Sequence, residues 1–186
     1  MKNAKDWIKM EIIKVPQARI KALRGDRGSV TRMLEEKLKA SISLDKDGTV
    51  TIEGEPVDEF FALPVIKAIA RGFEPRVALK LLNDEYGMKV IDLRDFARNA
   101  KTMARVRGRI IGEEGKAKKI IEDEAEVQVA IHGHTVAIIG ELELIDIAAT
   151  AVFKLAEGVP HGGVYLYLEK NRRRRKAEEL KRKAGR

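Results

Sequence analysis

The chain has 186 residues, 44% of them hydrophobic, which is enough to form one large domain or two small ones. It contains no cysteine, which excludes disulfides, thiolate metal ligands and cysteine nucleophiles. No apolar run approaches the ~18 residues of a membrane helix, and the first residues lead into no signal-peptide core. We therefore expect a cytoplasmic protein without a membrane partner. Abundant Lys, Arg and Glu, with few Asn and Gln, are typical of thermophile proteins.

The net charge of +8 is unevenly distributed. Residues 169–186 carry ten basic and three acidic groups, so the remaining residues carry 37 − 10 = 27 basic and 29 − 3 = 26 acidic groups. Within this balanced body, residues 14–39 hold eight basic and three acidic groups, and residues 101–119 hold seven and two. Two basic segments on a nearly neutral body indicate two separate electrostatic surfaces.

An internal repeat organises the chain. Gly25–Gly28 and Gly112–Gly115 are both Gly-x-x-Gly tetrapeptides, and they are 87 positions apart. The segments 49–54 and 135–140 are also similar, at an offset of 86. Two similar blocks in nearly constant register predict two copies of one module. At about 85 residues each, the copies are too long for solenoid units and suit two small domains.

The first copy predicts the order β-α-α-β-β-α from its apolar periodicity and turn residues. In chain order, we expect a strand over 10–15, a helix over 17–24, a loop over 25–28, a helix from about 30 to 38, strands over 41–44 and 49–53, and a helix over 57–70. Gly72 ends the last helix, and Pro64 predicts a break or kink within it.

The second copy predicts the same order with one insertion. In chain order, we expect a strand over 88–93, an extra segment over 94–101, a helix from about 102 to 110, a loop over 112–115, a helix over 117–125, strands over 127–131 and 136–138, and a helix over 141–156. Residues 73–87 connect the copies, and their leucines predict a packed connector and an interface between the two modules. The segment from Glu169 onward predicts a solvated basic helix or a frayed end.

Each Gly-x-x-Gly loop lies between two predicted helices. Glycine allows a sharp turn and a close approach of the backbone to a ligand, and the following helix offers free amides and the positive end of its dipole. Together these features suit a phosphodiester backbone. A single such loop is a weak signal, but here it occurs twice between equivalent elements with basic flanks.

The run from Arg109 to Ile121 resembles the core of a KH domain, and the run from Leu23 to Val30 is a looser match. The resemblance implies an α+β fold of two tandem type I KH domains packed together, each with a three-stranded antiparallel sheet and three helices. We assign residues 8–82 to the first domain, with the connector from about 73, residues 88–168 to the second, and residues 169–186 to a basic C-terminal tail. KH domains clamp about four unpaired nucleotides between the loop and an apolar groove.

The two modules, together with Gly140-Glu141, the run 158–161 and the basic end, are similar to the Pno or Dim proteins, which assemble the small ribosomal subunit. This chain resembles the shorter archaeal version. The resemblance implies single-stranded RNA binding near the 3′ end of 16S rRNA or its precursor. It also implies a protein partner, either a Nob-type endonuclease or a translation or ribosome assembly factor.

The candidate RNA-binding residues are those of the two loops and their flanks: Arg24, Gly25, Asp26, Arg27, Gly28, Arg32, Arg107, Arg109, Ile111, Gly112, Glu113, Glu114, Gly115, Lys116, Lys118 and Lys119. The pair Glu113-Glu114 departs from the basic residue that many KH loops carry, and two carboxylates near a phosphate are unfavourable. The lysines and arginines around them could offset this; if they do not, the first loop, with Arg27, is the better phosphate site. We expect the second module to dominate binding.

Other readings fit less well. A P-loop needs Gly at 110 and Ser or Thr at 117, whereas the chain has Ile110 and Ala117. His132 and His134 lie in a turn without a third strong ligand, so no metal site is predicted. No nucleophile and base are paired, and we expect neither an enzyme nor a cofactor. One alternative stays open: a protein-interaction scaffold in which one KH module docks a nuclease or a translation factor.

Overall fold

The protein is described by a computed structural model of residues 11–184, which divides into two compact units, one ending at Asp84 and the other beginning at Glu85. Each unit contains one of the two predicted modules. Three predicted ends lie outside the described residues: residue 10 of the first strand, residues 8–10 of the first domain, and residues 185–186 of the tail. The expected interface between the modules stays a prediction.

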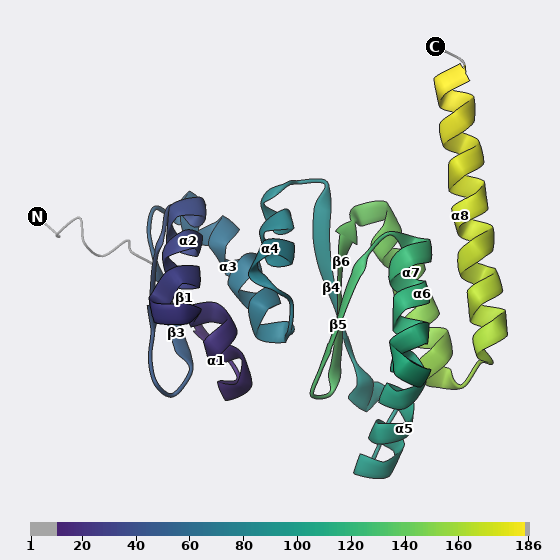
Figure 1. Ribbon diagram of the computed structural model, residues 1–186, viewed down its shortest axis with the longest axis horizontal. Coiled ribbons are helices and arrows are strands. Elements are labelled where there is room, and N and C mark those ends of the chain that lie inside the picture. The colour runs from purple at the N-terminus through teal and green to yellow at the C-terminus, as the bar shows by residue number, and fades with distance from the viewer. Residues whose placement is uncertain (1–10, 185–186) are drawn as a thin grey trace, which may run out of the picture. The chain divides into compact units, whose positions relative to one another are not determined.

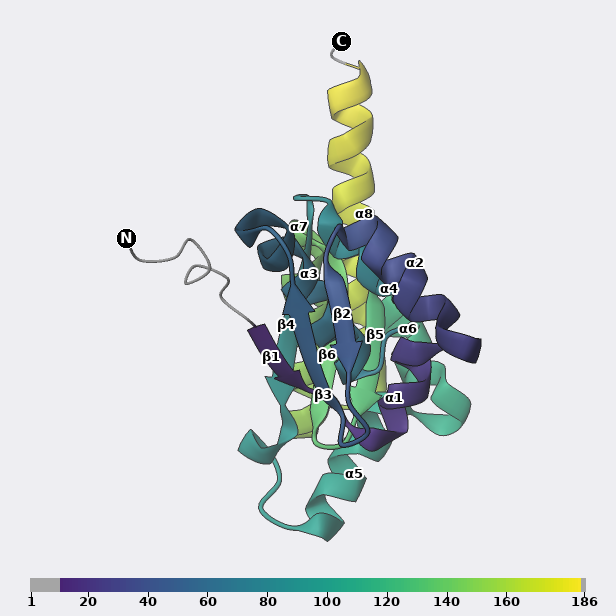
Figure 2. The same ribbon diagram turned by 90° about the vertical axis from the view of Figure 1, so that its left-hand side faces the viewer.

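The first unit confirms the predicted β-α-α-β-β-α order. Its elements are β1 (Glu11–Lys14), α1 (Gln17–Arg24), the 3₁₀ turn η1 (Asp26–Gly28), α2 (Ser29–Leu38), β2 (Ser41–Leu44), β3 (Thr49–Glu53), α3 (Pro56–Arg71), α4 (Pro75–Ala78) and the 3₁₀ turn η2 (Leu79–Leu82). The antiparallel sheet has the order β1-β3-β2, and Figure 2 shows β3 between the two edge strands. Val50 and Ile52 alternate with more exposed residues on β3 and are fully buried, as a half-buried strand requires.

The second unit repeats this arrangement and adds a long helix. Its elements are β4 (Tyr86–Asp92), the 3₁₀ turn η3 (Leu93–Asp95), α5 (Ala100–Ile111), the 3₁₀ turn η4 (Glu113–Gly115), α6 (Lys116–Ala125), β5 (Gln128–His132), β6 (Thr135–Glu141), α7 (Leu142–Glu157) and α8 (His161–Ala184). The sheet order is β4-β6-β5, and its core includes the fully buried Ile121, Ile138 and Leu155. The C-terminal half of α8 extends beyond α6 and α7 (Figure 1).

Of the break or kink predicted at Pro64, the break is wrong, because α3 runs without interruption from Pro56 to Arg71, and the kink stays a prediction. Proline removes the hydrogen bond to the carbonyl four residues earlier, and here that residue is Phe60, which is 71% exposed. The affected carbonyl therefore lies on the solvent side of the helix. Val65 and Ile66, which follow the proline, are fully buried and hold the second half of α3 in the core.

The connector and the tail are both helical. The connector forms α4 and η2, with Phe73 and Ala78 buried. The residues on which the predicted packed connector rested, Val77, Leu79, Leu81 and Leu82, are only half-buried, so this prediction is confirmed in part. The tail continues α8, a single helix from His161 to Ala184, and the predicted helix is confirmed. Its first turns are not solvated all round, however, because Arg172 and Arg175 contact α6.

Candidate nucleic-acid interface

The two Gly-x-x-Gly loops adopt the same backbone conformation. The angle φ is +66° at Gly25 and +74° at Gly112, and it is +80° and +79° at the last glycines, Gly28 and Gly115. Positive φ is costly for residues with a Cβ. The sequence repeat is therefore a repeat of local geometry.

The two glycines of each loop have different tasks. A Cβ on Gly25 would lie 2.5 Å from Val30 Cγ2, and one on Gly112 would lie 2.6 Å from the amide nitrogen of Ala117. The first glycine is thus required by the packing of the loop on the following helix. A Cβ on Gly28 or Gly115 would have no atom of the described residues within 4 Å. The last glycine therefore leaves open space in front of the backbone, where a ligand can approach.

The residue before each last glycine also has a left-handed backbone. Arg27 has φ +50° and Glu114 has φ +49°, and both side chains are exposed. Residues other than glycine rarely adopt this conformation, and such outliers concentrate at functional sites. The exposed side chain on this strained residue is cationic in the first module and anionic in the second.

A groove of about 540 Å³ lies next to the first loop. It is lined by Arg24, Arg27, Gly28, Thr31, Arg32, Ile42 and Leu44. The apolar side chains come from β2, and the three arginines come from the end of α1, the loop and α2. An apolar wall with cations along its edge can hold unpaired bases and their phosphates at the same time.

Two side chains of α2 brace the first loop. Arg32 Nη2 donates to the carbonyl oxygen of Arg27 at 3.3 Å, and Thr31 Oγ1 donates to the carbonyl oxygen of Leu23 at 3.1 Å. Asp26, the other variable residue of the loop, is exposed. The structure therefore brings together the first-module candidates Arg24, Arg27, Gly28 and Arg32 in one groove.

The same hydrogen bond in each module fixes the correspondence between the two grooves. Glu35 Oε1 accepts from the backbone amide of Ile42 at 2.9 Å, and Glu122 Oε1 accepts from that of Val129 at 2.8 Å. The offset is 87 for donor and acceptor alike. The second-module counterparts of the groove residues are therefore Ile111, Glu114, Gly115, Lys118, Lys119, Val129 and Ile131.

The second groove differs in charge. Ile111 stands where the first module has Arg24, and Glu114 stands where it has Arg27. Lys118 Nζ lies 3.5 Å from Glu122 Oε1, which offsets part of its charge. Glu113, Lys116 and Lys119 are exposed around the loop. This surface is more apolar than the first and has little net charge.

One of the predicted residues, Arg109, is bonded to another element of the second unit. Arg109 Nε donates to the carbonyl oxygen of Leu155 at 2.9 Å, and its Nη2 donates to that of Val159 at 2.6 Å, at the C-terminal end of α7. Arg19 makes an equivalent pair of bonds at the end of α3, and its burial lowers its pKa. Arg107 is half-buried, and its Nε has no hydrogen-bond partner among the described residues. We leave Arg109 out of the proposed interface.

Sequence reasoning did not single out Thr31, Ile42 and Leu44, nor the two bracing carboxylates Glu35 and Glu122. The repeat offset of 87 relates Glu35 to Glu122 and Ile42 to Val129, and this signal could have found both pairs. The groove itself could not be found this way, because it forms only when α2 packs beside β2.

Comparison with known proteins relates the chain to one family. Residues 87–173 match the family of the second KH domain of PNO1, described as a eukaryotic-type KH domain, or type I. The chain is 41% identical to the KH domain-containing protein MJ0443 of Methanocaldococcus jannaschii over 89% of its own length and 75% of that protein. It is 34% identical to the pre-rRNA-processing protein pno1 of Aspergillus fumigatus over 56% of its own length, but spans only 43% of that longer protein.

A solved structure is similar over almost the whole chain. It is the a/eIF2alpha-aDim2p-rRNA complex from Pyrococcus horikoshii, which matches 91% of this chain and 97% of the matched chain, with a TM-score of 0.83 and 38% identity. Similarity of this extent covers both modules. Among residues 11–184, no helix is long and apolar enough to cross a membrane.

Proposed function

Because this chain belongs to the archaeal Dim2/Pno1-type family of KH-domain proteins, we propose that it binds single-stranded RNA near the 3′ end of 16S rRNA or its precursor. The binding serves maturation of the small ribosomal subunit in the cytoplasm. Proteins of this family are not enzymes, and the proposal assigns no reaction to the chain. The observation that carries it is the pair of loops, which present the same open backbone at Gly28 and Gly115.

The first groove supports RNA as the ligand. Arg24, Arg27 and Arg32 line its edge, while Ile42 and Leu44 offer apolar surface for bases. Arginine suits phosphate recognition because its planar guanidinium can donate two parallel hydrogen bonds. The similar P. horikoshii protein was solved together with rRNA.

A second candidate function is protein docking by one module. The exposed Glu113 and Glu114 favour it for the second module, because carboxylates at the loop tip repel phosphates. The P. horikoshii relative was solved together with a/eIF2alpha, so a translation factor is the partner to test first, and a Nob-type endonuclease the next. Both functions are compatible in a protein with two modules.

Fluorescence anisotropy with a labelled oligonucleotide from the 3′ end of 16S rRNA tests the proposal. The structure shows that Gly28→Asp and Gly115→Asp are the informative variants, because substitution of the first glycines would disturb packing. Gly158→Asp is the matched control, since Gly158 also has positive φ and no described atom within 4 Å of a Cβ, but lies at the end of α7.

We expect at least one loop variant to weaken binding by about ten-fold or more, because a hydrogen bond to a charged group contributes roughly 1.5–3 kcal/mol. The control variant should bind like the wild type. Affinity should fall with salt by a slope of about −0.7 per phosphate contact, whereas apolar docking of a protein depends weakly on salt. Equal affinity for a scrambled strand, or wild-type binding by both loop variants, would refute RNA recognition by the loops.

A further inference from the structure

The run Arg172–Arg175 is divided between two faces of α8. The side chains of Arg173 and Arg174 are 79% and 68% exposed, whereas those of Arg172 and Arg175 are 36% and 22% exposed. An α-helix turns by about 100° per residue, so four consecutive side chains point in four directions. The arginine run is therefore not a single charged patch.

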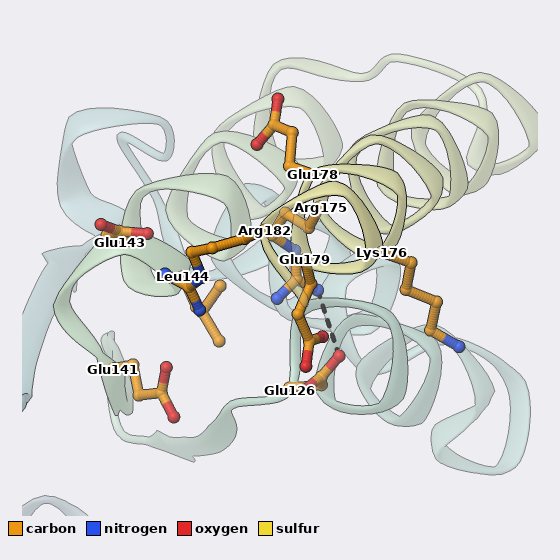
Figure 3. Close-up of a pocket in the computed structure, with 9 residues that line it drawn as sticks. All are labelled: Glu126, Glu141, Glu143, Leu144, Arg175, Lys176, Glu178, Glu179 and Arg182. Carbon is orange, nitrogen blue, oxygen red and sulfur yellow. Dashed lines mark hydrogen bonds and ion pairs between the residues drawn. The ribbon is translucent and has the colours of Figure 1, made fainter. Parts of the chain in front are cut away.

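Arg172 and Arg175 anchor the helix. Arg172 Nη1 donates to Glu124 Oε1 at 2.9 Å, and Arg175 Nη2 donates to the carbonyl oxygen of Glu124 at 3.1 Å and to Glu126 Oε1 at 3.3 Å. Figure 3 shows the last of these contacts. The carbonyl lies at the C-terminal end of α6, where the helix dipole favours a cation. Together with the buried Val164 and Leu168, these contacts fix which side of α8 faces the module.

The opposite side of α8 carries a narrow strip of basic residues. At 3.6 residues per turn, Lys170, Arg173, Arg174 and Lys181 fall within an arc of roughly 100°, and all four are exposed. The arc is about 16 Å long at 1.5 Å per residue. The glutamates of this segment, Glu169, Glu178 and Glu179, lie outside it. We call these four residues the outward arc.

The charges of the outward arc are available to a ligand. Arg173 contacts Glu169, and Arg174 lies 3.8 Å from Glu178, but both pairs are exposed and four residues apart in the helix. Such pairs contribute only about 0.3–0.5 kcal/mol, so a phosphate can replace either carboxylate. Leu166 and Leu180 are exposed on the same side. They are 14 residues, or about 21 Å, apart, and form no continuous apolar surface for a protein partner.

We propose that the outward arc binds the sugar-phosphate backbone of RNA that flanks the strand held by the KH loops, without regard to sequence. This inference rests on the proposed function. The arc has cations but neither aromatic side chains nor a groove, so it lacks the means to read bases. α8 starts beside the last turn of α5, which leads into the second loop: His161 Nε2 lies 2.8 Å from the carbonyl oxygen of Arg109. It then extends beyond α6 and α7 (Figure 1 and Figure 2). The outward arc lies level with the C-terminal end of α6 and beyond it, because Arg172 and Arg175 contact Glu124. RNA that continues from the loop along the length of α6, about 15 Å, therefore reaches a basic surface.

Anisotropy with three RNAs tests the inference. The first is the short single-stranded target, the second adds a hairpin, and the third adds an unpaired extension of the same number of nucleotides. The arc variant is Arg173→Gln/Arg174→Gln/Lys181→Gln. Its matched control, Lys176→Gln/Arg182→Gln/Lys183→Gln, removes the same charge from the same helix outside the arc; Lys176 and Arg182 line the pocket in Figure 3. Glutamine is a good helix former, so both variants should fold, which circular dichroism checks.

For the wild type, we expect an extended RNA to bind about ten-fold more tightly than the short one, with a salt slope steeper by about 2 to 3. The arc variant should lose this gain and the control should keep most of it, while both bind the short RNA like the wild type. A larger gain from the hairpin or from the unpaired extension identifies the form of RNA that is bound.

Three results would overturn the inference: no gain from either extension, equal losses in both variants, or a loss on the short RNA confined to the arc variant. Wild-type binding to the short RNA tests the proposed function separately, so failure of the arc leaves that function standing. If the wild type does not bind the short RNA, both the proposed function and the inference about the arc are wrong.

Discussion

The first module has Asp26-Arg27 between its loop glycines and the second has Glu113-Glu114, yet the positive φ angles at corresponding positions of the two loops agree to within 8°. Both modules also use a glutamate of the second helix to hold an edge strand, β2 in the first and β5 in the second. The groove residues, by contrast, have diverged from Arg24 and Arg27 to Ile111 and Glu114. Glycine positions and bracing bonds are constrained by folding, whereas exposed groove residues are free to change with the ligand.

This comparison assigns different contributions to the two grooves. We expect the first to supply most of the salt-dependent affinity, because three arginines line it. The second, with the half-buried Ile111 and Ile131 beside a loop of low net charge, is expected to bind through apolar contacts. The closer KH resemblance lies in the second module, and the expectation that this module dominates overall binding stays a prediction. The following predictions test the loop geometry and the bracing bonds that the two modules share, and the difference in charge between their grooves.

The largest effect is expected on stability. Gly25→Ala and Gly112→Ala should each lower the free energy of unfolding by about 3 kcal/mol or more, since backbone strain of roughly 1–3 kcal/mol adds to an overlap with the next helix. Gly28→Ala and Gly115→Ala should cost only about 1 kcal/mol, from strain alone. Urea unfolding followed by circular dichroism measures both pairs. Equal losses at the first and last glycines would contradict the division of tasks within the loops.

The next effect is on RNA affinity. Arg24→Gln/Arg27→Gln/Arg32→Gln should weaken binding by about a hundred-fold at moderate salt and reduce the salt slope by about 2, because three phosphate contacts are lost. The control Lys37→Gln/Lys46→Gln/Lys67→Gln removes the same charge from exposed positions outside the groove. Anisotropy at several salt concentrations measures both. Similar losses in the two variants would show that net charge, and not the groove, sets the affinity.

Loss of the bracing hydrogen bond should lower stability less, and by the same amount in both modules. Glu35→Ala and Glu122→Ala each remove the acceptor of a part-buried backbone amide, which should cost about 1–2 kcal/mol. Thermal unfolding of the two variants provides the comparison. If only one variant is destabilised, the bracing bond is not a shared structural element.

The next prediction reverses the loop charge. Glu114→Arg should strengthen RNA binding by about three- to ten-fold and steepen the salt slope by about 0.7, since one repulsive charge becomes one phosphate contact. Arg27→Glu in the first module should do the opposite. Fluorescence anisotropy with the same oligonucleotide at several salt concentrations measures the affinity and the salt slope of both variants. No change for Glu114→Arg would favour protein docking by the second module.

The smallest effect concerns acid stability. Hydrogen bonds from Lys14 lower the pKa of Asp47 from 3.8 to about 2, and those from Arg94 do the same for Asp92. A depressed folded-state pKa stabilises the protein above about pH 4 and ceases to do so as pH falls towards 2. Asp47→Asn and Asp92→Asn should therefore each weaken the fall of the melting temperature between pH 4 and 2. If both variants keep the wild-type dependence of melting temperature on pH, these exposed contacts do not contribute to acid stability.

Much of the fold was determined by the sequence. Apolar periodicity predicted the element order of both modules, and the repeat at offsets of 87 and 86 predicted that the two are alike. The Gly-x-x-Gly pattern predicted the two loops, because positive φ at fixed positions is a local requirement that glycine satisfies. These features depend on neighbours in the chain, and a sequence records neighbours directly.

Other features depended on packing between distant segments, and only the tertiary structure decided them. Arg109 resembled a phosphate ligand in the sequence, but the C-terminal end of α7 packs against α5 and supplies carbonyl oxygens for its guanidinium. Pro64 predicted a break that core contacts of Val65 and Ile66 prevent. The arginine run became two anchors and two exposed cations only because α8 packs against α6 on one side. A charged side chain has the same identity in all these places, and its partners in space determine whether it stabilises the fold or remains available for RNA.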